Sequence, residues 1–379
     1  MKTCVCIAGG GPAGMMLGLL LARAGIDVTV HEKHGDFLRD FRGDTIHPST
    51  LEVIAELGLL EEFLKLPHQK VPEIGGQFGE LQGRIADFRY LPVRCGYIAM
   101  MPQWDFLDFL ARHASRYPGF KLRMNSEVAS LEGLDASLVI GADGRHSTVR
   151  TLAGLEVEDY GAPMDVLWFR ISLRADDPTL SMGRFDAGRV FVQLNRGDYW
   201  QCAYVIPKGS ADEIRRAGLD AFRAGIARMM PFAAERTAEI RDWEQVKLLT
   251  VKVDRLKRWY RDGLLCIGDA AHAMSPVGGV GINLAIQDAV AAANILSGPL
   301  LKNELRIEHL AAVQRRREWP VRVTQRFQLA VQNRVIARVL RADQQLEPPL
   351  FFRLLTRYAW LRRIPGRLIG MGVRPEHVV

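Results

Sequence analysis

The chain has 379 residues, of which 48% are apolar and 25% are charged. This length exceeds what a single hydrophobic core usually serves, so two closely packed domains are expected, and the average composition excludes a fibrous or disordered protein. The net charge of +7 is uneven, because residues 302–379 carry 16 Lys and Arg against 6 Asp and Glu, which leaves the rest of the chain nearly neutral.

The basic C-terminal part can be interpreted in several ways. A basic helical run can attract nucleic acid or an anionic membrane, but it more often forms a solvated face or a subunit contact. We therefore expect no nucleic-acid partner and a possible homodimer, with membrane association through this segment as the lesser alternative. The apolar residues between 351 and 361 are expected to face the body of the protein or a second subunit.

The five cysteines are odd in number and lack C-x-x-C spacing. They indicate small buried hydrophobes in a reducing compartment, so a cytoplasmic location and no metal site are expected. Residues 5–22 are apolar, but the Gly-Gly-Gly-Pro run at 9–12 interrupts them and Arg23 closes them. We expect no targeting or membrane-spanning segment.

The first elements follow a β-α-β order. Residues 3–8 and 26–31 have the pattern of strands, and residues 13–24 between them favour a helix. This order within about 30 residues is typical of a dinucleotide-binding fold. Further along, the patterns predict helices over 48–64 and 105–116, strand-like text over 71–101, and a strand over 120–131.

The middle of the chain is typical of an antiparallel sheet. One join is unusual, because only about six residues separate the strand ending near Leu131 from the strand starting near Leu138. Either the hairpin there is minimal, or residues are missing from the sequence. The remaining elements are expected as strands over 138–140, 166–173, 189–194, 199–206, 243–253 and 264–267, and as helices over 210–230, 283–296 and most of the C-terminal part.

The expected fold class is α/β (α+β), with a Rossmann-like domain, an antiparallel β-sheet domain and a helical C-terminal segment. The Rossmann-like domain is expected to be discontinuous, formed by residues 1–70, 97–160 and 255–320. The β-sheet domain comprises 71–96 and 161–254, and the helical segment comprises 321–379.

A glycine-rich motif lies between the first strand and the first helix. Gly9, Gly11 and Gly14 fit G-x-G-x-x-G, with Pro12 and Ala13 at the helix start. In this motif the first glycine permits a tight turn, the second lets phosphate approach the backbone, and the third packs helix against strand. The helix start suits a pyrophosphate. Glu32, followed by Lys33, ends the second strand at the spacing expected for an acid that binds a ribose.

Two more polar motifs follow buried strands. Asp143 belongs to Gly-Ala-Asp-Gly at 141–144, and Gly268 and Asp269 open Gly-Asp-Ala-Ala-His at 268–272. Each Asp can accept a hydrogen bond from a ribityl or ribose hydroxyl. A loop then leads into an apolar helix, whose positive end would stabilise negative charge on a flat ring. The residues of this loop expected at the cofactor are Pro276, Gly279, Gly281, Ile282 and Asn283.

Through these three motifs, the sequence resembles the group A FAD-dependent aromatic monooxygenases, which have the p-hydroxybenzoate hydroxylase fold. The resemblance implies non-covalent FAD and NAD(P)H as a transient co-substrate. It also implies hydroxylation of a small aromatic or conjugated substrate by O2 through a flavin C4a-hydroperoxide. Asp143 would serve FAD and NADPH binding, Asp269 the ribityl chain, and the backbone at Ile282 and Asn283 the pyrimidine edge.

Three further positions follow from the resemblance. Arg42 matches an arginine that reaches the phosphate and ribose of FAD, Gln103 matches a polar residue that contacts FAD, and Val128 lies where a strand backbone meets adenine. The alternatives are a surface salt bridge for Arg42 and an ordinary helix start for Gln103.

Substrate residues are less well marked. His47, Trp168, Tyr204 and Pro276 are candidates, although strand alternation sends only half of the sheet positions toward any one site. His272 is expected to support its loop rather than to act as a base, and no catalytic side chain can be assigned.

Several features of the family are absent or altered. Residues 202–207 lack the two tryptophans of flavin halogenases, which disfavours halogenation, and Val280 replaces a polar or basic residue common in hydroxylases. Two other function classes remain open, namely an FAD-dependent reductase or dehydrogenase of the isoprenoid type and a non-catalytic flavin-binding protein.

Overall fold

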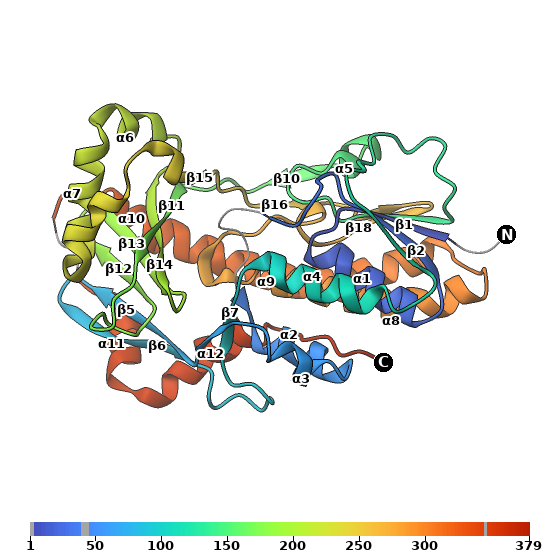
Figure 1. Ribbon diagram of the computed structural model, residues 1–379, viewed down its shortest axis with the longest axis horizontal. Helices are drawn as coiled ribbons and strands as arrows, with labels where there is room; N and C mark the ends of the chain where they lie inside the picture. Colours follow the sequence, from blue (N-terminus) through green and yellow to red (C-terminus); the bar gives the residue numbers. More distant parts are fainter. Residues whose placement is uncertain (1–3, 39–44, 345–346) are drawn as a thin grey trace.

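The computed structural model describes residues 4–38, 45–344 and 347–379. Two sheets lie at opposite ends of an elongated molecule, and the long helix α9 (Ile307–Val331) runs between them (Figure 1). Mixed sheet and helix of this kind confirms the expected α/β (α+β) class. Arg42 lies outside the described residues.

The first sheet has six strands in the order β17-β18-β9-β1-β2-β8. All neighbouring pairs are parallel except β17 with β18, and β1 is central because its apolar residues are buried on both faces. The strands are β1 (Cys4–Ala8), β2 (Asp27–His31), β8 (Phe120–Arg123), β9 (Leu138–Gly141), β17 (Tyr260–Arg261) and β18 (Leu264–Cys266).

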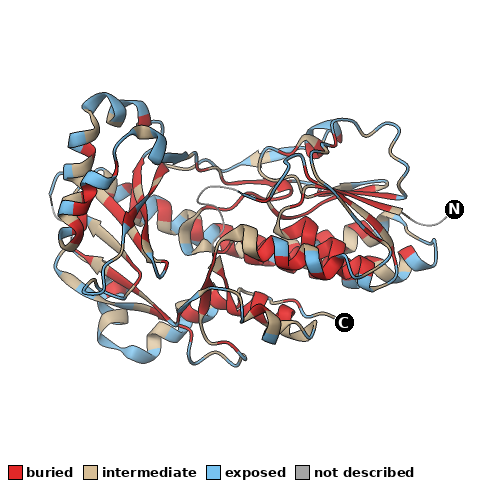
Figure 2. Ribbon diagram, in the orientation of Figure 1, coloured by how far each residue is buried: buried red, intermediate tan, exposed pale blue. Residues whose placement is uncertain are grey.

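Apolar helices pack on this sheet (Figure 2). Nearly every residue of α1 (Pro12–Arg23) is buried, and α1 packs against α8 (Gly281–Leu301) and α4 (Gln103–Ala114). The segment Val277–Leu301 is long and apolar enough to cross a membrane, but two thirds of its most apolar window is buried inside the protein. That burial is typical of a core helix.

The second sheet has seven strands in the order β15-β11-β14-β13-β12-β5-β6. All pairs are antiparallel except β12 with β5. The strands are β5 (Glu73–Phe78), β6 (Leu81–Asp87), β11 (Met164–Ser172), β12 (Met182–Asp186), β13 (Arg189–Asn195), β14 (Tyr199–Pro207) and β15 (Lys247–Leu249).

The two faces of this sheet bury different partners. On the α7 face, Phe169 and Cys202 pack with Phe222 of α7 (Leu219–Met229), which follows α6 (Ala211–Ala217). On the α10 face, Val166 and Val205 pack against the continuation of α9. That continuation consists of the π-helix η5 (Gln332–Ile336) and α10 (Ala337–Leu340).

Smaller elements connect the sheets. A two-stranded ladder pairs β10 (Val157–Asp159) with β16 (Asp254–Leu256), and β7 (Ile98–Met100) pairs with β3 (Thr45–Ile46) and β4 (Gln69–Val71). The remaining helical segments are α2 (Pro48–Glu56), α3 (Leu60–Phe63), α5 (Thr148–Leu152), η1 (Pro231–Glu239), η2 (Trp243–Gln245), η3 (Gly268–Ala270), η4 (Val277–Gly279), α11 (Leu350–Arg357), η6 (Ala359–Arg362) and α12 (Arg363–Gly370).

Three sequence expectations were wrong in extent. The helix expected over 48–64 is two helices, because Gly58 at φ +74° ends the first of them. The strand expected over 120–131 ends at Arg123, since Asn125 adopts φ +51° and the chain continues as a loop without a hairpin up to β9. The strand expected over 243–253 is reduced to β15, because the capped turn η2 takes its first residues.

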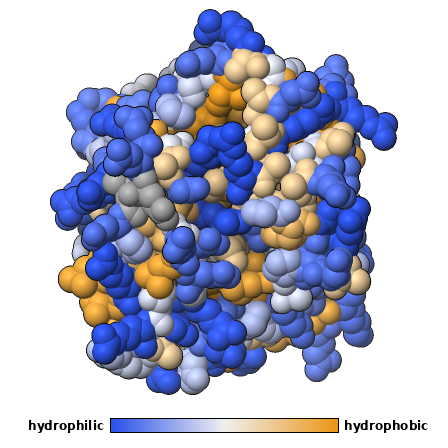
Figure 3. All heavy atoms as spheres, turned by 90° about the vertical axis from the view of Figure 1, so that its left-hand side faces the viewer, coloured by the Kyte–Doolittle hydropathy of each residue, from blue (hydrophilic) through white to orange (hydrophobic). Residues whose placement is uncertain are grey.

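The basic C-terminal segment packs on the body of the same chain, as expected. Gly366 of α12 lies so close to β6 that a Cβ there would be 2.2 Å from the carbonyl oxygen of Asp87. Phe352 is buried against Phe78, but Phe351, Leu354 and Trp360 are exposed in this chain, so the body covers only part of the expected apolar face. Apolar and charged side chains mix on this end of the molecule (Figure 3).

Candidate active site

Each glycine of the glycine loop is explained by different steric surroundings. Gly9 has φ +107°, and a Cβ on it would lie 2.3 Å from the carbonyl oxygen of Ala142. A Cβ on Gly14 would lie 2.0 Å from the carbonyl oxygen of Gly9. At Gly11, no atom of the described residues other than its chain neighbours lies within 4 Å of the Cβ position. Gly9 and Gly14 are therefore required by the fold, whereas Gly11 leaves room for a ligand.

Glu32 closes the loop from the end of β2. Its carboxylate is buried and accepts hydrogen bonds from the backbone N–H groups of Gly10 and His34, both at 3.0 Å. These contacts hold the carboxylate beside the glycine loop, and Lys33 is exposed next to it.

Two helix N-termini meet at this loop. Neither α1, with Gly11 at its N-cap, nor α8, with Val280 at its N-cap, has a side-chain cap. A Cβ at Gly268 would lie 3.1 Å from Cβ of Ala13 in α1 and 3.3 Å from Cβ of Ala285 in α8. Uncapped N–H groups and two positive helix ends thus converge on Gly268, an arrangement that suits an anionic ligand.

The two aspartates of the later motifs are held differently. Asp143 accepts hydrogen bonds from the Ser147 hydroxyl at 2.5 Å and the Val149 N–H at 3.0 Å, so both of its oxygens serve the start of α5. Asp269 is about one-third exposed, and its carboxylate lies 3.7 Å from the guanidinium of Arg145. The carboxylate of Asp269 is therefore the more available of the two for a ligand.

A buried ionic network that the motifs did not reveal holds the Gly268 loop. Oδ2 of Asp288 accepts hydrogen bonds from the Gly268 N–H at 3.0 Å and from Nε2 of His272 at 2.6 Å. Oδ1 accepts from Nε of Arg317 at 2.9 Å, and Arg317 also pairs with Glu376. Burial acts to raise the pKa of Asp288, but His272 and Arg317 hold it below its usual value. His272 therefore supports its loop, as expected.

Two glutamines of α9 clamp the same loops. Nε2 of Gln325 donates to the carbonyl oxygens of Asp254 and Ala273, and Nε2 of Gln328 donates to those of Ser275 and Val277. Their positions three residues apart place both on one helix face. In the sequence, the only signal of this role is a pair of glutamines within a run that is predicted to be helical.

His47 lies at the loop before α8. Its Nδ1 donates to the carbonyl oxygen of Ile369 in α12 at 2.9 Å, and Thr45 donates to the carbonyl oxygen of Gly279 at 3.0 Å. Burial lowers the pKa of His47 to about 4, although the carbonyl groups of Ile369 and Gly279 favour its charged form. His47 is therefore neutral at pH 7, with Nε2 free of a hydrogen bond among the described residues.

The other predicted cofactor residues fall around the same loops with one difference. Gln103 begins α4, Ile282 and Asn283 lie in the first turn of α8, and Asn283 accepts a hydrogen bond from Thr50 at 2.5 Å. Val128 lies in the loop after β8 and not in a strand, so that part of its prediction was wrong.

The candidate substrate residues divide between the two faces of the second sheet. Trp168 lies on the α10 face and packs against the same apolar cluster as Val277, the neighbour of Pro276. Tyr204 packs on the α7 face, with its ring against Phe191 and Phe222. Its candidacy as a substrate residue was wrong, because alternation along β14 turns it away from the loop that holds Pro276.

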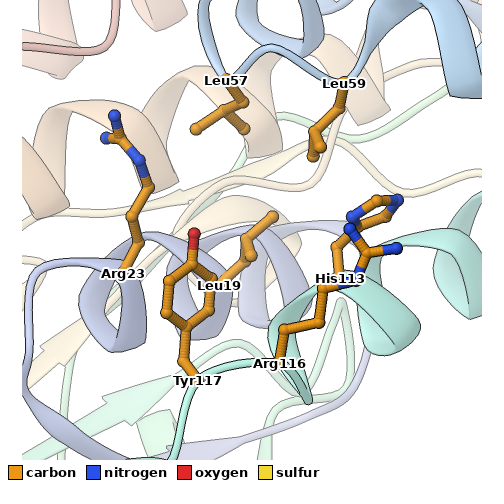
Figure 4. Close-up of a pocket in the computed structure, with 7 residues that line it drawn as sticks. All are labelled: Leu19, Arg23, Leu57, Leu59, His113, Arg116 and Tyr117. Carbon is orange, nitrogen blue, oxygen red and sulfur yellow. The ribbon is translucent and has the colours of Figure 1, made fainter.

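A small cavity lies apart from these groups. It is about 70 Å³ in volume and is lined by Leu19 and Arg23 of α1, together with residues of α4 and the turns beside it (Figure 4). Because it borders the C-terminal end of α1, while the glycine loop is at the other end, it is not part of this site.

Comparison with known proteins decides the family. The model of the FAD binding domain family matches residues 2–133 and 132–326. The 6-methylpretetramide 4-monooxygenase of Streptomyces rimosus is 32% identical over 369 residues, which cover 91% of this chain and 87% of that protein. The chain belongs to the FAD-dependent aromatic monooxygenases. FAD is thus its cofactor, and it is an oxidoreductase.

Other members of the family show the same relationship at lower identity. Rifampicin monooxygenase of Streptomyces venezuelae is 29% identical over 304 residues, which cover 75% of this chain and 62% of that protein. The structure of the OxyS anhydrotetracycline hydroxylase from S. rimosus superposes with a TM-score of 0.77 at 23% identity, covering 99% of this chain and 77% of that one. This likeness shows the shared fold.

Proposed function

We propose that FAD lies across the first sheet with its pyrophosphate at the start of α1. The convergence of two uncapped helix N-termini on Gly268 carries this proposal, because it supplies N–H donors and positive potential beside the open space at Gly11. In this arrangement Glu32 serves the adenosine ribose and Asp269 the ribityl chain. The pyrimidine edge of the flavin meets the backbone at Ile282 and Asn283.

The proposed reaction is NAD(P)H-dependent hydroxylation of an aromatic or conjugated substrate with O2. FAD supplies the redox and oxygen chemistry. The protein orients the substrate and excludes water. The neutral imidazole of His47 holds α12 against the loop at Gly279, so it helps to close this side of the site.

The relatives support an extended aromatic substrate. Their names give 6-methylpretetramide and rifampicin as substrates, and we propose a substrate of similar aromatic character for this chain. Anaerobic reduction of the FAD-loaded protein by NADPH or NADH, followed by oxygen, tests the reaction with a panel of polycyclic phenols and quinones. Turnover that yields a reduced product without incorporated oxygen would favour a reductase instead.

The proposed domain limits follow the division of the chain into two sheets. We propose that residues 1–70, 97–160 and 255–320 form the FAD-binding domain, and that 71–96 and 161–254 form the substrate domain. The strands of the six-stranded sheet fall in the first set and those of the seven-stranded sheet in the second. Limited proteolysis that first cuts inside a set, rather than between sets, would argue against these limits.

We also propose a cytoplasmic homodimer that uses the surface of α11 and α12. Leu350, Phe351, Trp360 and Ile364 are more than half exposed there, beside several arginines. Several large apolar side chains exposed on neighbouring helical segments are typical of a subunit contact. Sedimentation of the FAD-loaded protein and of a Phe351→Glu, Trp360→Glu variant tests this, with a monomer at all concentrations as the contrary result.

A further inference from the structure

The α10 face of the second sheet carries two buried polar atoms without a hydrogen-bond partner among the described residues. They are Nε1 of Trp168 and Oε1 of Gln201. A buried polar group without a hydrogen-bond partner destabilises the folded state, so most such groups in folded proteins are paired. These two atoms are therefore open to a hydrogen bond from a bound ligand.

Strand register places the two side chains close together on that face. Trp168 of β11 is opposite Ala203 of β14, and Arg170 is opposite Gln201. Diagonal neighbours of this kind have Cα atoms about 7–8 Å apart, within reach of long side chains. Trp200 and Cys202, on either side of Gln201, pack on the α7 face. Gln201 is therefore turned to the α10 face together with Trp168.

The surroundings connect both residues to the proposed flavin site. Trp168 belongs to the same apolar cluster as Val277, whose carbonyl oxygen is held by Gln328. Gln201 is opposite Leu194 of β13, which packs in the cluster that contains Met100 and Ile369. The carbonyl oxygen of Ile369 accepts the hydrogen bond from His47. The cluster beside Trp168 thus includes a residue of the loop before α8, and the cluster beside Gln201 includes Ile369, which is bound to His47.

We propose that Trp168 and Gln201 determine substrate specificity as a pair, and this inference rests on the proposed function. The indole N–H donates a hydrogen bond to the substrate, and the carboxamide oxygen of Gln201 accepts one from it. The complementary substrate therefore carries an acceptor, such as a carbonyl oxygen, and a hydroxyl donor on one edge of its aromatic system. Both polar groups become satisfied only when such a molecule is bound.

Gln193 provides a matched control on the neighbouring strand. It is a buried glutamine whose Oε1 also lacks a partner among the described residues. Unlike Gln201, Gln193 lies on the α7 face of the sheet, because it is opposite Cys202. A substitution there removes the same chemical group without touching the proposed pair.

The test compares binding of two probes to the FAD-loaded wild type and to Gln201→Met, Trp168→Phe and Gln193→Met. The probes are 2-hydroxyanthraquinone, which carries acceptors and a hydroxyl donor that its own carbonyl groups cannot engage, and 9,10-anthraquinone, which carries only acceptors. Dissociation constants are measured from the change in flavin absorbance. We expect the wild type and Gln193→Met to prefer the hydroxylated probe by roughly tenfold, as one net hydrogen bond provides. Gln201→Met should lose most of that preference, because it removes the acceptor for the hydroxyl group. Trp168→Phe should instead weaken the binding of both probes by roughly tenfold, because both carry the acceptor that the indole N–H binds.

An unchanged preference in Gln201→Met, or an unchanged affinity for both probes in Trp168→Phe, would overturn the inference. A wild type that binds neither probe, or that does not discriminate between them, would overturn it too. If Gln201→Met does not fold, the result for Trp168→Phe decides. Failure of the proposed function is seen separately, as a wild type that retains FAD but incorporates no oxygen with any compound of the panel. The binding measurement is independent of turnover and remains decisive in that case.

Discussion

Nε of Arg317 on α9 donates to Oδ1 of Asp288 on α8 over 2.9 Å, and both side chains are completely buried. Because Asp288 also holds the Gly268 loop, this pair joins the C-terminal helices to the cofactor site. Arg317→Met leaves a buried carboxylate without its cation, so we expect a loss of 3–5 kcal/mol, roughly, in the free energy of unfolding. FAD affinity should fall as well.

Chemical denaturation and FAD titration measure both effects. Arg322→Met is the control on the same helix, since Arg322 is half exposed and pairs with Glu318 at the surface. A surface pair contributes about 0–1 kcal/mol. Equal losses in the two variants would contradict the assigned role of Arg317.

The aspartates of the two motifs should separate stability from cofactor binding. Asp269→Ala removes a ligand for the ribityl chain and should weaken FAD binding by about 1–3 kcal/mol with little change in stability. Asp143→Ala removes the groups that hold the start of α5, and should destabilise the fold by about 0.5–2 kcal/mol. Calorimetric FAD titration and thermal unfolding distinguish these outcomes, and an unchanged FAD dissociation constant in Asp269→Ala would remove it from the site.

The glycine loop offers a similar contrast. The methyl group of Gly11→Ala meets no atom within 4 Å among the described residues beyond its chain neighbours, so the variant should fold normally. It should bind FAD at least about tenfold more weakly, because the methyl group occupies the space left for the pyrophosphate. Gly14→Ala clashes with the Gly9 carbonyl group and should not fold stably. Circular dichroism and FAD content report both results. A Gly11→Ala variant with wild-type FAD affinity would place the pyrophosphate elsewhere.

His47 should give the protein a measurable dependence of stability on pH. Its pKa in the folded state is about 4, below the ordinary value of 6.5, so the unfolded chain binds the extra proton first as pH falls. The free energy of unfolding should therefore decrease between pH 6.5 and 4, by up to about 3 kcal/mol from this residue. Urea unfolding of the wild type and of His47→Asn across that pH range gives two free energies of unfolding. Their difference isolates the contribution of His47. His34→Gln, at an exposed position, is the control, and a wild-type slope in His47→Asn would contradict the account.

The sequence predicted those parts of the site that are formed by residues adjacent in the chain. The order of strand, glycine loop and helix at residues 4–23 follows from local propensity and from steric demands at Gly9 and Gly14. The same holds for the apolar helix α8, whose start faces the proposed flavin position. The family resemblance rested on these local motifs, and the comparisons confirm it.

The rest depends on how distant segments pack. Asp288 and Arg317 are 29 residues apart, and the contact of His47 with Ile369 spans 322. No local sequence pattern predicts either contact. Alternation showed that β14 has two faces, but only the docking of α7 decides that Tyr204 lies on the face that α7 covers. The loop after β8 was misread because Asn125 and Ser126 bond to residues near Glu32 rather than to a partner strand.

The central claim is that this chain uses FAD and NAD(P)H to insert one atom of O2 into an aromatic substrate. The most direct test supplies the FAD-loaded protein with NADPH or NADH, ¹⁸O2 and the panel of polycyclic phenols and quinones, and analyses the products by mass spectrometry. We predict substrate-stimulated oxidation of the nicotinamide and one ¹⁸O atom in the hydroxylated product. Stimulated oxidation that yields only reduced, unlabelled product would contradict the account.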